Sequence, residues 1–279
     1  MTIKNQLKTA MLLAVLTALL LWIGSFFGRA GFYFALVFVG VMNIASYWFS
    51  DKIVLWMYRA KQAKESEYPK LYKIVKDVSN LSGLPMPKVY VIPSEQSNAF
   101  ACGRSPKNAA VACTEGILKL MTEEELKGVI AHEFAHIKNR DILISTVAGT
   151  IAGVISYIGN MFMWSAMFGD DDNRGNIFGL LFLAIITPIV ASIIQLAISR
   201  SREYLADETG ARFVRNGNHL ADALEKIEKN VAAHPMRMGT QATAHLFISN
   251  PLRQGAFLAL FMTHPSTKSR TERLRNMKF

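Results

Sequence analysis

The stretch AHEFAHIKNRD, residues 131–141, places two histidines four positions apart, with an acid directly after the first. On an α-helix this spacing puts His132 and His136 on one face, one turn apart. Two imidazoles so placed can bind one Zn²⁺ ion at about 2.0–2.1 Å. Glu133 points to the side of the pair, where it misses the metal but can reach a water beside it. The spacing therefore predicts the helix-borne metal site of a zinc hydrolase.

The residues before the motif predict the helix on which its spacing has meaning. Thr122 and the acids at 123–125 have the pattern of a capping box, with negative charge at the positive end of the helix dipole. Leu126, Val129 and Ile130 then supply an apolar face at helical spacing. We therefore expect one helix to carry both histidines.

A third ligand is expected, because catalytic zinc usually has three protein ligands. The stretch SREYLADE, residues 201–208, offers Glu203 as a carboxylate ligand. Asp207 lies one helical turn later, placed to accept the proton of the outer nitrogen of a zinc-bound histidine. Taken alone, both acids are better explained as part of a solvated helix face. Together with an HExxH motif in the same chain, the role at the metal is favoured. Asp141 is a further candidate partner for a histidine, although a surface pair with Arg140 explains it equally well.

Four stretches together carry a family resemblance: HEFAHIKNRD (132–141), SREYLADETGARFV (201–214), AHLFISNPL (244–252) and THPSTKSRTERLRNM (263–277). They are similar to the HtpX-type membrane zinc proteases, which are gluzincins related to the CaaX prenyl endopeptidases. The resemblance runs over essentially the whole chain. It implies one Zn²⁺ ion per chain, bound by His132, His136 and Glu203, and it makes Glu133 the catalytic acid and base.

The same resemblance singles out a late His–Pro motif at His264. This histidine could donate to the oxyanion that forms when water attacks a peptide carbonyl. It is equally well explained as a residue near the start of the basic helix predicted over 266–277. Ser266 stands where relatives often carry a second proline, a departure that does not touch the zinc ligands.

Between the first apolar segments and the HExxH helix, the pattern predicts a small soluble α/β unit. We expect a helix over 68–81, a strand over 88–93 and a hairpin of strands at 97–104 and 108–113. In gluzincins a strand above the metal binds the substrate as an added β-strand. The resemblance gives this role to Asn98, Ala99, Phe100 and Ala101, or to residues 108–113. Plain sheet core explains both stretches equally well.

Composition and charge patterning indicate an integral membrane protein. The 279 residues are 51% hydrophobic, with a mean hydropathy of +0.21 and a formal net charge of +10. Segments 9–27 and 32–50 carry no charge, and each is close to the roughly 20 residues that cross a bilayer. Two further apolar segments, 142–168 and 177–198, either cross as a second hairpin or form protein-buried helices that only partly enter the membrane.

The distribution of Lys and Arg predicts the orientation. Six basic residues flank the first pair of segments on one side: Lys4, Lys8, Lys52, Arg59, Lys61 and Lys64. The loop between the second pair is acidic at 170–172. Both termini and the catalytic domain are therefore expected in the cytoplasm, with the lipid bilayer as the partner of the basic charge. A nucleic-acid function has no recognisable binding module behind it, and Cys102 and Cys113 are expected as apolar strand residues.

These observations predict a mainly α protein with a small β-sheet, four transmembrane helices and a cytoplasmic zincin-like catalytic domain. We expect a helix pair at 1–60 and a second helix pair at 142–198, with the catalytic domain divided between 61–141 and 199–279. The predicted activity is zinc-dependent hydrolysis of membrane or membrane-adjacent polypeptides at the inner membrane. The resemblance implies quality control of misfolded proteins. The alternatives are a dedicated CaaX-type processing protease and a membrane scaffold with a structural metal.

Overall fold

The computed structural model describes residues 28–148, 151, 200–233, 248 and 265–279, with scattered positions between 7 and 25. These residues form a mainly helical protein with one small mixed sheet, as predicted. The helices are α2 (Gly28–Met57), α3 (Pro69–Ser82), α4 (Glu115–Leu120), α5 (Glu123–Asn139), α8 (Arg200–Val214), α9 (Asn218–Ala233) and α10 (Thr267–Arg275). The strands are β1 (Lys61–Gln62), β2 (Lys88–Ile92), β3 (Ala99–Ser105) and β4 (Asn108–Thr114).

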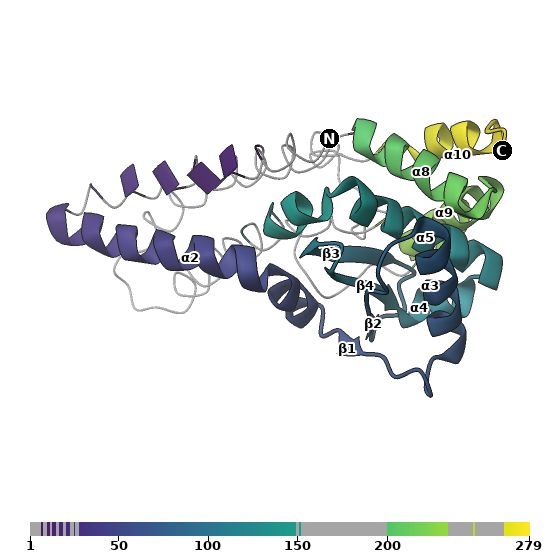
Figure 1. The fold of residues 1–279 in the computed structure, drawn as a ribbon, viewed down its shortest axis with the longest axis horizontal. Coiled ribbons are helices and arrows are strands. Elements are labelled where there is room, and N and C mark those ends of the chain that lie inside the picture. The colour runs from purple at the N-terminus through teal and green to yellow at the C-terminus, as the bar shows by residue number, and fades with distance from the viewer. Residues whose placement is uncertain are drawn as a thin grey trace.

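The sheet has the order β1-β2-β4-β3 (Figure 1). β3 and β4 form the predicted antiparallel hairpin, while β2 lies parallel to β4. β3 is therefore an edge strand, and β4 is an interior strand. An interior strand has no free hydrogen-bonding edge, so the alternative that residues 108–113 accept an added substrate strand does not fit this topology.

The two faces of the sheet pack against different helices. Val54 and Leu55 near the end of α2, and Tyr58 directly after it, pack on the face that contains Phe100 and Cys102. The opposite face packs on α3 and α5, and its core contains Ala99, Ala101, Val111, Cys113, Ile74, Val129 and Phe134. Both cysteines are buried and unbridged, as expected. The HExxH helix thus lies on one face of the sheet and the end of α2 on the other.

α2 joins the sheet to an apolar segment. In Figure 1 this helix projects far beyond the sheet, and only its last turns lie against the strands. Among the described residues, one stretch, Gly28–Ala45, is long and apolar enough by length and composition to cross a bilayer. α2 contains all of the predicted segment 32–50. From the earlier segment, Thr17 accepts a hydrogen bond of 2.9 Å from the Asn43 side chain. Of the second predicted pair, residues 152–199 lie outside the described residues.

α5 begins as its sequence predicts. The Thr122 side chain accepts from the Glu125 N–H at 3.2 Å, and the Glu125 carboxylate accepts from the Thr122 N–H at 2.9 Å. This is the predicted capping box. At the other end Arg140 has φ +56°, so the chain turns back sharply onto the last turn of the helix.

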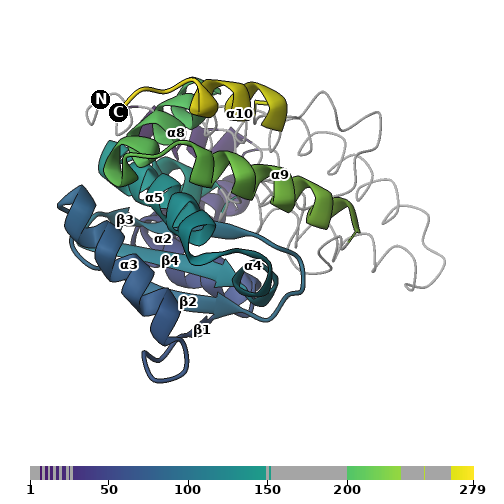
Figure 2. The ribbon, with the colours of Figure 1, turned by 90° about the vertical axis from the view of Figure 1, so that its right-hand side faces the viewer.

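α8 approaches α5 closely because residue 210 has no side chain. A Cβ at Gly210 would lie 2.8 Å from the backbone nitrogen of His132 and 2.9 Å from the Ala131 carbonyl oxygen. α9 and α10 then cover this pair of helices (Figure 2). α8 contains the SREYLADE stretch, and α10 lies within the helix predicted over 266–277.

We predict that Gly210→Ala destabilises the protein, although Ala normally favours a helix over Gly. The added methyl group would push against α5 backbone, an overpacking cost of about 1–3 kcal/mol in the free energy of unfolding. Thermal or denaturant unfolding in detergent measures this. Gly40→Ala is the matched control, because a Cβ at Gly40 meets no atom within 4 Å. If Gly210→Ala left the free energy of unfolding unchanged, the two helices would be able to separate without cost.

Candidate metal centre

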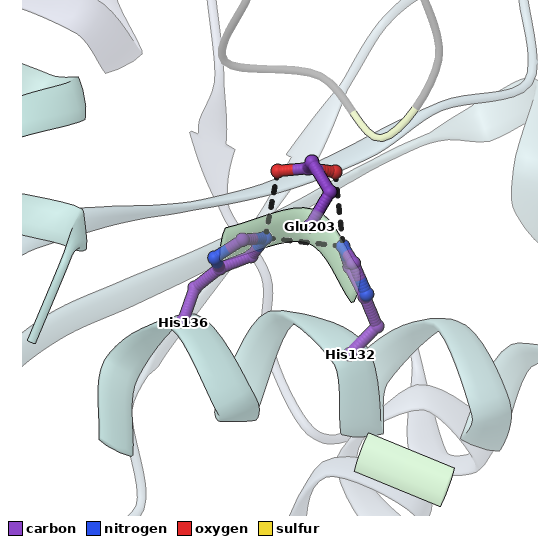
Figure 3. Close-up of side chains that lie close together, drawn as sticks. All are labelled: His132, His136 and Glu203. Carbon is purple, nitrogen blue, oxygen red and sulfur yellow. Dashed lines mark hydrogen bonds and ion pairs between the residues drawn. The ribbon is translucent and has the colours of Figure 1, made fainter. Parts of the chain in front are cut away.

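The two histidines of the HExxH motif lie side by side on α5, one turn apart, with their ring nitrogens facing each other (Figure 3). The His132 side chain is 1% exposed and the His136 side chain 18%. Their Nε2 atoms are 3.1 Å apart, and the two rings are perpendicular. Both Nε2 atoms therefore point to the same small region.

Glu203 reaches this region from α8 (Figure 3). Its Oε1 lies 3.6 Å from Nε2 of His136, and its Oε2 lies 3.9 Å from Nε2 of His132. One donor atom from each of the three residues lies within 4.8 Å of the others. Tetrahedral ligands at zinc distances are separated by about 3.3 Å, so small side-chain adjustments bring the three atoms onto one ion.

The outer nitrogens of both histidines contact carboxylates. His132 Nδ1 is 2.9 Å from Oδ1 of Asp207, and His136 Nδ1 is 3.1 Å from Oδ2 of Asp141. Asp141 is 3% exposed, so a surface pair with Arg140 does not describe it. Instead, the left-handed turn at Arg140 brings Asp141 back against the helix that carries His136.

These contacts fix the chemistry of the inner nitrogens. An ionised carboxylate can only accept hydrogen bonds, so each Nδ1 donates its proton outward and each neutral ring turns a lone pair inward. Two lone pairs 3.1 Å apart, beside a carboxylate oxygen, repel one another unless a metal ion or a proton lies between them. Two imidazole nitrogens and one carboxylate oxygen are a donor set that suits a divalent metal ion.

Glu133 lies beside this donor set and is not part of it. It is 3% exposed, and its carboxylate accepts a hydrogen bond from the backbone of Ala101 on β3. Burial raises the pKa of Glu133 to about 8, although the nearby His136 opposes that shift. The acid of the motif is therefore close to the metal ligands and to the edge strand, with a pKa in the range useful for proton transfer near neutral pH.

The two histidines of the motif differ in their pKa. Burial lowers the pKa of His132. Burial also acts to lower the pKa of His136, but the charges of Asp141, Glu203 and Glu133 outweigh it and raise that pKa to about 10. Without a metal, a proton on His136 therefore supplies some of the positive charge that these carboxylates require.

Arg270 is a site residue that the sequence did not reveal, since it belongs to a run of basic residues in the last helix. It is 2% exposed. Its Nε and Nη2 donate to the two oxygens of Asp207 at 2.9 and 2.6 Å, and its Nη1 donates to the Ile248 carbonyl at 3.1 Å. Burial acts to raise the pKa of Asp207, but Arg270 and His132 outweigh it and lower that pKa. The predicted His264 lies outside the described residues.

The predicted substrate strand lies at the sheet edge. All four residues are buried: Asn98, Ala99, Phe100 and Ala101. The Phe100 ring packs against Tyr58, directly after α2, on the face away from the histidines. The Ala99 carbonyl faces away from β4 and accepts from the Ile248 N–H at 3.2 Å. The side chains are thus core, whereas the backbone of β3 lies next to Glu133.

A histidine pair on one helix, an acid from a second helix and a buried acid beside them define a metallopeptidase type of site. The chain belongs to peptidase family M48, whose sequence model matches residues 65–278. It is 51% identical to "Protease HtpX homolog" of Syntrophobacter fumaroxidans, over 98% of this chain and 99% of that protein. It is 50% identical to "Protease HtpX homolog" of Thermococcus kodakarensis, over 97% and 95%.

The fold is also similar to a solved structure, the crystal structure of S. mikatae Ste24p. The TM-score is 0.51, and the match covers 98% of this chain and 66% of that chain at 18% sequence identity. This likeness concerns the fold alone. The family and the protease relatives, by contrast, make this protein a peptidase with a candidate metal site at His132, His136 and Glu203.

The raised pKa of His136 predicts how metal binding depends on pH. Below pH 10 the metal-free protein holds a proton that a metal ion must displace from Nε2. The apparent affinity should therefore rise with pH, by at least about tenfold per unit between pH 6 and 8. Competition of Zn²⁺ with a chromophoric chelator at pH 6, 7 and 8 measures this. Equal affinities at the three pH values would contradict the assignment of His136 as a ligand.

Proposed function

We propose that this protein is a zinc-dependent endopeptidase of membrane or membrane-adjacent polypeptides. His132, His136 and Glu203 are its proposed zinc ligands, and Glu133 is its catalytic acid and base. The observation that carries the proposal is the convergence of three donor atoms within 4.8 Å, with both histidines oriented by carboxylates. A structural metal site has no need of a buried acid beside its ligands, so the position of Glu133 favours catalysis.

Zinc is proposed because of the ligand types. Two imidazoles and one carboxylate are a usual catalytic zinc set, which leaves a further coordination position open. A bound Zn²⁺ ion supplies Lewis acidity to a substrate carbonyl and acidifies water at its open position. Asp207 and Asp141 hold the two rings in the tautomer that presents Nε2 to the ion.

Glu133 is proposed to move the proton during hydrolysis. Its carboxylate takes a proton from the attacking water and passes it to the nitrogen of the departing amine. The pKa of about 8 applies to the site without a cation, and a positive charge nearby lowers it. Both protonation states of the Glu133 carboxylate are therefore accessible near neutral pH, as the two transfers require.

We propose the outer edge of β3 as the substrate-binding strand, through Asn98, Ala99, Phe100 and Ala101. The support is its edge position and the hydrogen bond between Ala101 and Glu133. An extended peptide that pairs with this edge would lie next to Glu133, the proposed catalytic acid and base. At Ala99 such a peptide would replace the hydrogen bond now made by the Ile248 N–H.

The first experiment separates chemistry from metal binding. Glu133→Gln keeps the size of the side chain but removes the base, so peptide hydrolysis should fall by about 10²–10⁴-fold while zinc content is retained. Glu203→Gln should lose zinc as well as activity, because a neutral amide is a poorer ligand. The assays are peptide hydrolysis and zinc content of protein purified without self-cleavage.

Glu208→Gln is the matched control for Glu203→Gln, because Glu208 is exposed on the same helix and pairs with Arg212 on its surface. It should change neither zinc content nor activity. A Glu133→Gln protein as active as the parent would rule out the hydrolase mechanism and leave a structural metal.

We also propose a multi-pass topology, with spans at 9–27, 32–50, 142–168 and 177–198. The second pair of spans divides one cytoplasmic catalytic domain into residues 61–141 and 199–279. The proposal is supported by the apolar stretch of α2 and by the packing of α5, which precedes that pair, on α8 and α9, which follow it. Lys and Arg gather on the catalytic side of both pairs.

Reporter fusions test this topology. A fusion at Asp171 should report a location outside the cytoplasm, and a fusion at Phe279 a cytoplasmic one, because the acidic loop lies opposite the basic flanks. The fusion at Phe279 is the internal control for correct insertion. A cytoplasmic signal at Asp171 would mean that the second apolar pair does not cross the bilayer.

For the biological role we propose quality control of misfolded membrane proteins at the inner membrane, which is what the resemblance to the HtpX-type proteases implies. Half of all residues are identical to those of the two HtpX-homologue proteases described above, over nearly the full length of both chains. In the proposed orientation the site lies on the cytoplasmic side, where basic residues would meet anionic lipid.

A further inference from the structure

The guanidinium of Arg270 lies buried between the two helices that supply the metal ligands and the C-terminal helix. α10 carries Arg270 into the site from the end of the chain, far from both ligand motifs in sequence. Its side chain is 2% exposed. A buried guanidinium stays charged, so its surroundings must supply negative charge and hydrogen-bond acceptors. Asp207 and Glu203 supply the charge.

The contact with Asp207 is bidentate and therefore directional. Nε and Nη2 donate to separate oxygens of Asp207, at 2.9 and 2.6 Å. Two parallel bonds of this kind fix the plane of a carboxylate, which a single point charge does not do. Oδ1, which accepts from Nη2, also lies 2.9 Å from Nδ1 of His132. The plane that Arg270 sets is therefore the plane that orients His132.

The third nitrogen of the same group lies near another metal-ligand candidate. Nη1 is 3.6 Å from Oε2 of Glu203 and donates to the Ile248 carbonyl at 3.1 Å. Ile248 in turn donates its N–H to Ala99 on the edge of β3. One guanidinium thus contacts the carboxylate that orients His132, the carboxylate of Glu203 and the segment that lies on the edge strand.

We propose that Arg270 is a positioning residue of the metal centre, which holds His132, through Asp207, and Glu203 in the arrangement that binds the ion. This inference rests on the proposed function, because it concerns the same ligands. Its consequence is that the ligand set is complete only when α10 is docked on α8. A residue that merely attached α10 to the protein would affect folding but would leave metal affinity and ligand geometry unchanged.

The chain offers a matched control on the same helix. Arg275 also binds two carboxylates, Asp222 and Glu225 of α9, at 2.8 and 3.0 Å. These pairs attach α10 to α9 at the surface and do not touch the site. Arg275→Gln therefore reports the effect of a loosened α10 without any change around Asp207.

The experiment compares Arg270→Lys, Arg270→Gln and Arg275→Gln in full-length chains that all carry Glu133→Gln, which prevents self-cleavage. Zn²⁺ affinity is measured by competition with a chelator at fixed pH, and the visible spectrum of the Co²⁺-loaded protein reports ligand geometry. We expect both Arg270 variants to bind Zn²⁺ about 10–100-fold more weakly and to change the Co²⁺ spectrum. Arg275→Gln should match its parent in both.

Arg270→Lys keeps the buried charge but cannot make the bidentate contact. It therefore tests the positioning role even if Arg270→Gln does not fold. Parental affinity and spectrum in Arg270→Lys would overturn the proposal. Failure of both variants to fold without metal would also overturn it, because Arg270 would then be required by the fold itself. A Glu133→Gln parent that binds no zinc would instead contradict the proposed function.

Discussion

The close approach of α8 to α5 at Gly210 is the contact on which the site depends. Backbone atoms of Ala131 and His132 lie 2.8–2.9 Å from the position that a Cβ of residue 210 would take. Only this separation lets the side chains one and two turns earlier on α8, Asp207 and Glu203, meet the histidines of α5. A glycine in a helix is unfavourable by roughly 0.5–1 kcal/mol relative to alanine. The packing of the ligand helices offsets that cost.

Charge balance explains why the polar groups brought together by this packing require a cation. Among the described residues, four carboxylates are buried within or beside the ligand set: Glu133, Asp141, Glu203 and Asp207. Two guanidinium groups, of Arg202 and Arg270, act electrostatically on them. When Glu133 is ionised, two negative charges remain, which is the charge that a divalent cation neutralises. Buried charge without such compensation is costly, so a bound divalent cation would also stabilise the site.

Local patterns in the sequence were sufficient for several of the elements and for some of the site. The spacing of His132 and His136, the capping box before them and the hairpin are short-range features, and the structure contains each of them. The prediction that Glu203 and Asp207 lie near the histidines followed from the HExxH motif, which supplies two ligands of a metal that usually has three. Each of these predictions concerns residues within a few turns of one another, or chemistry that demands a missing partner.

The remaining contacts depend on long-range packing, which a single sequence does not encode locally. Arg270 lies among other basic residues, and only the docking of α10 on α8 selects it for burial. Asp141 could not be distinguished from a surface acid, because its position follows from the left-handed turn at Arg140. In the same way, hydropathy predicted an apolar segment within α2 but not that Val54 and Tyr58 would pack on the sheet.

The contact of Val54 and Tyr58 with the sheet connects the apolar segment to the site through the hydrophobic core. The end of α2 packs on one face of the sheet, and α5 packs on the other face, with its histidines at the end away from the capping box. Close-packed interiors transmit displacement, because side chains that interdigitate cannot slide without opening a cavity. A tilt of α2 must therefore move the sheet and α5 with it. The same core thus fixes where the end of α2 lies relative to the histidines of α5 and to the β3 edge beside Glu133.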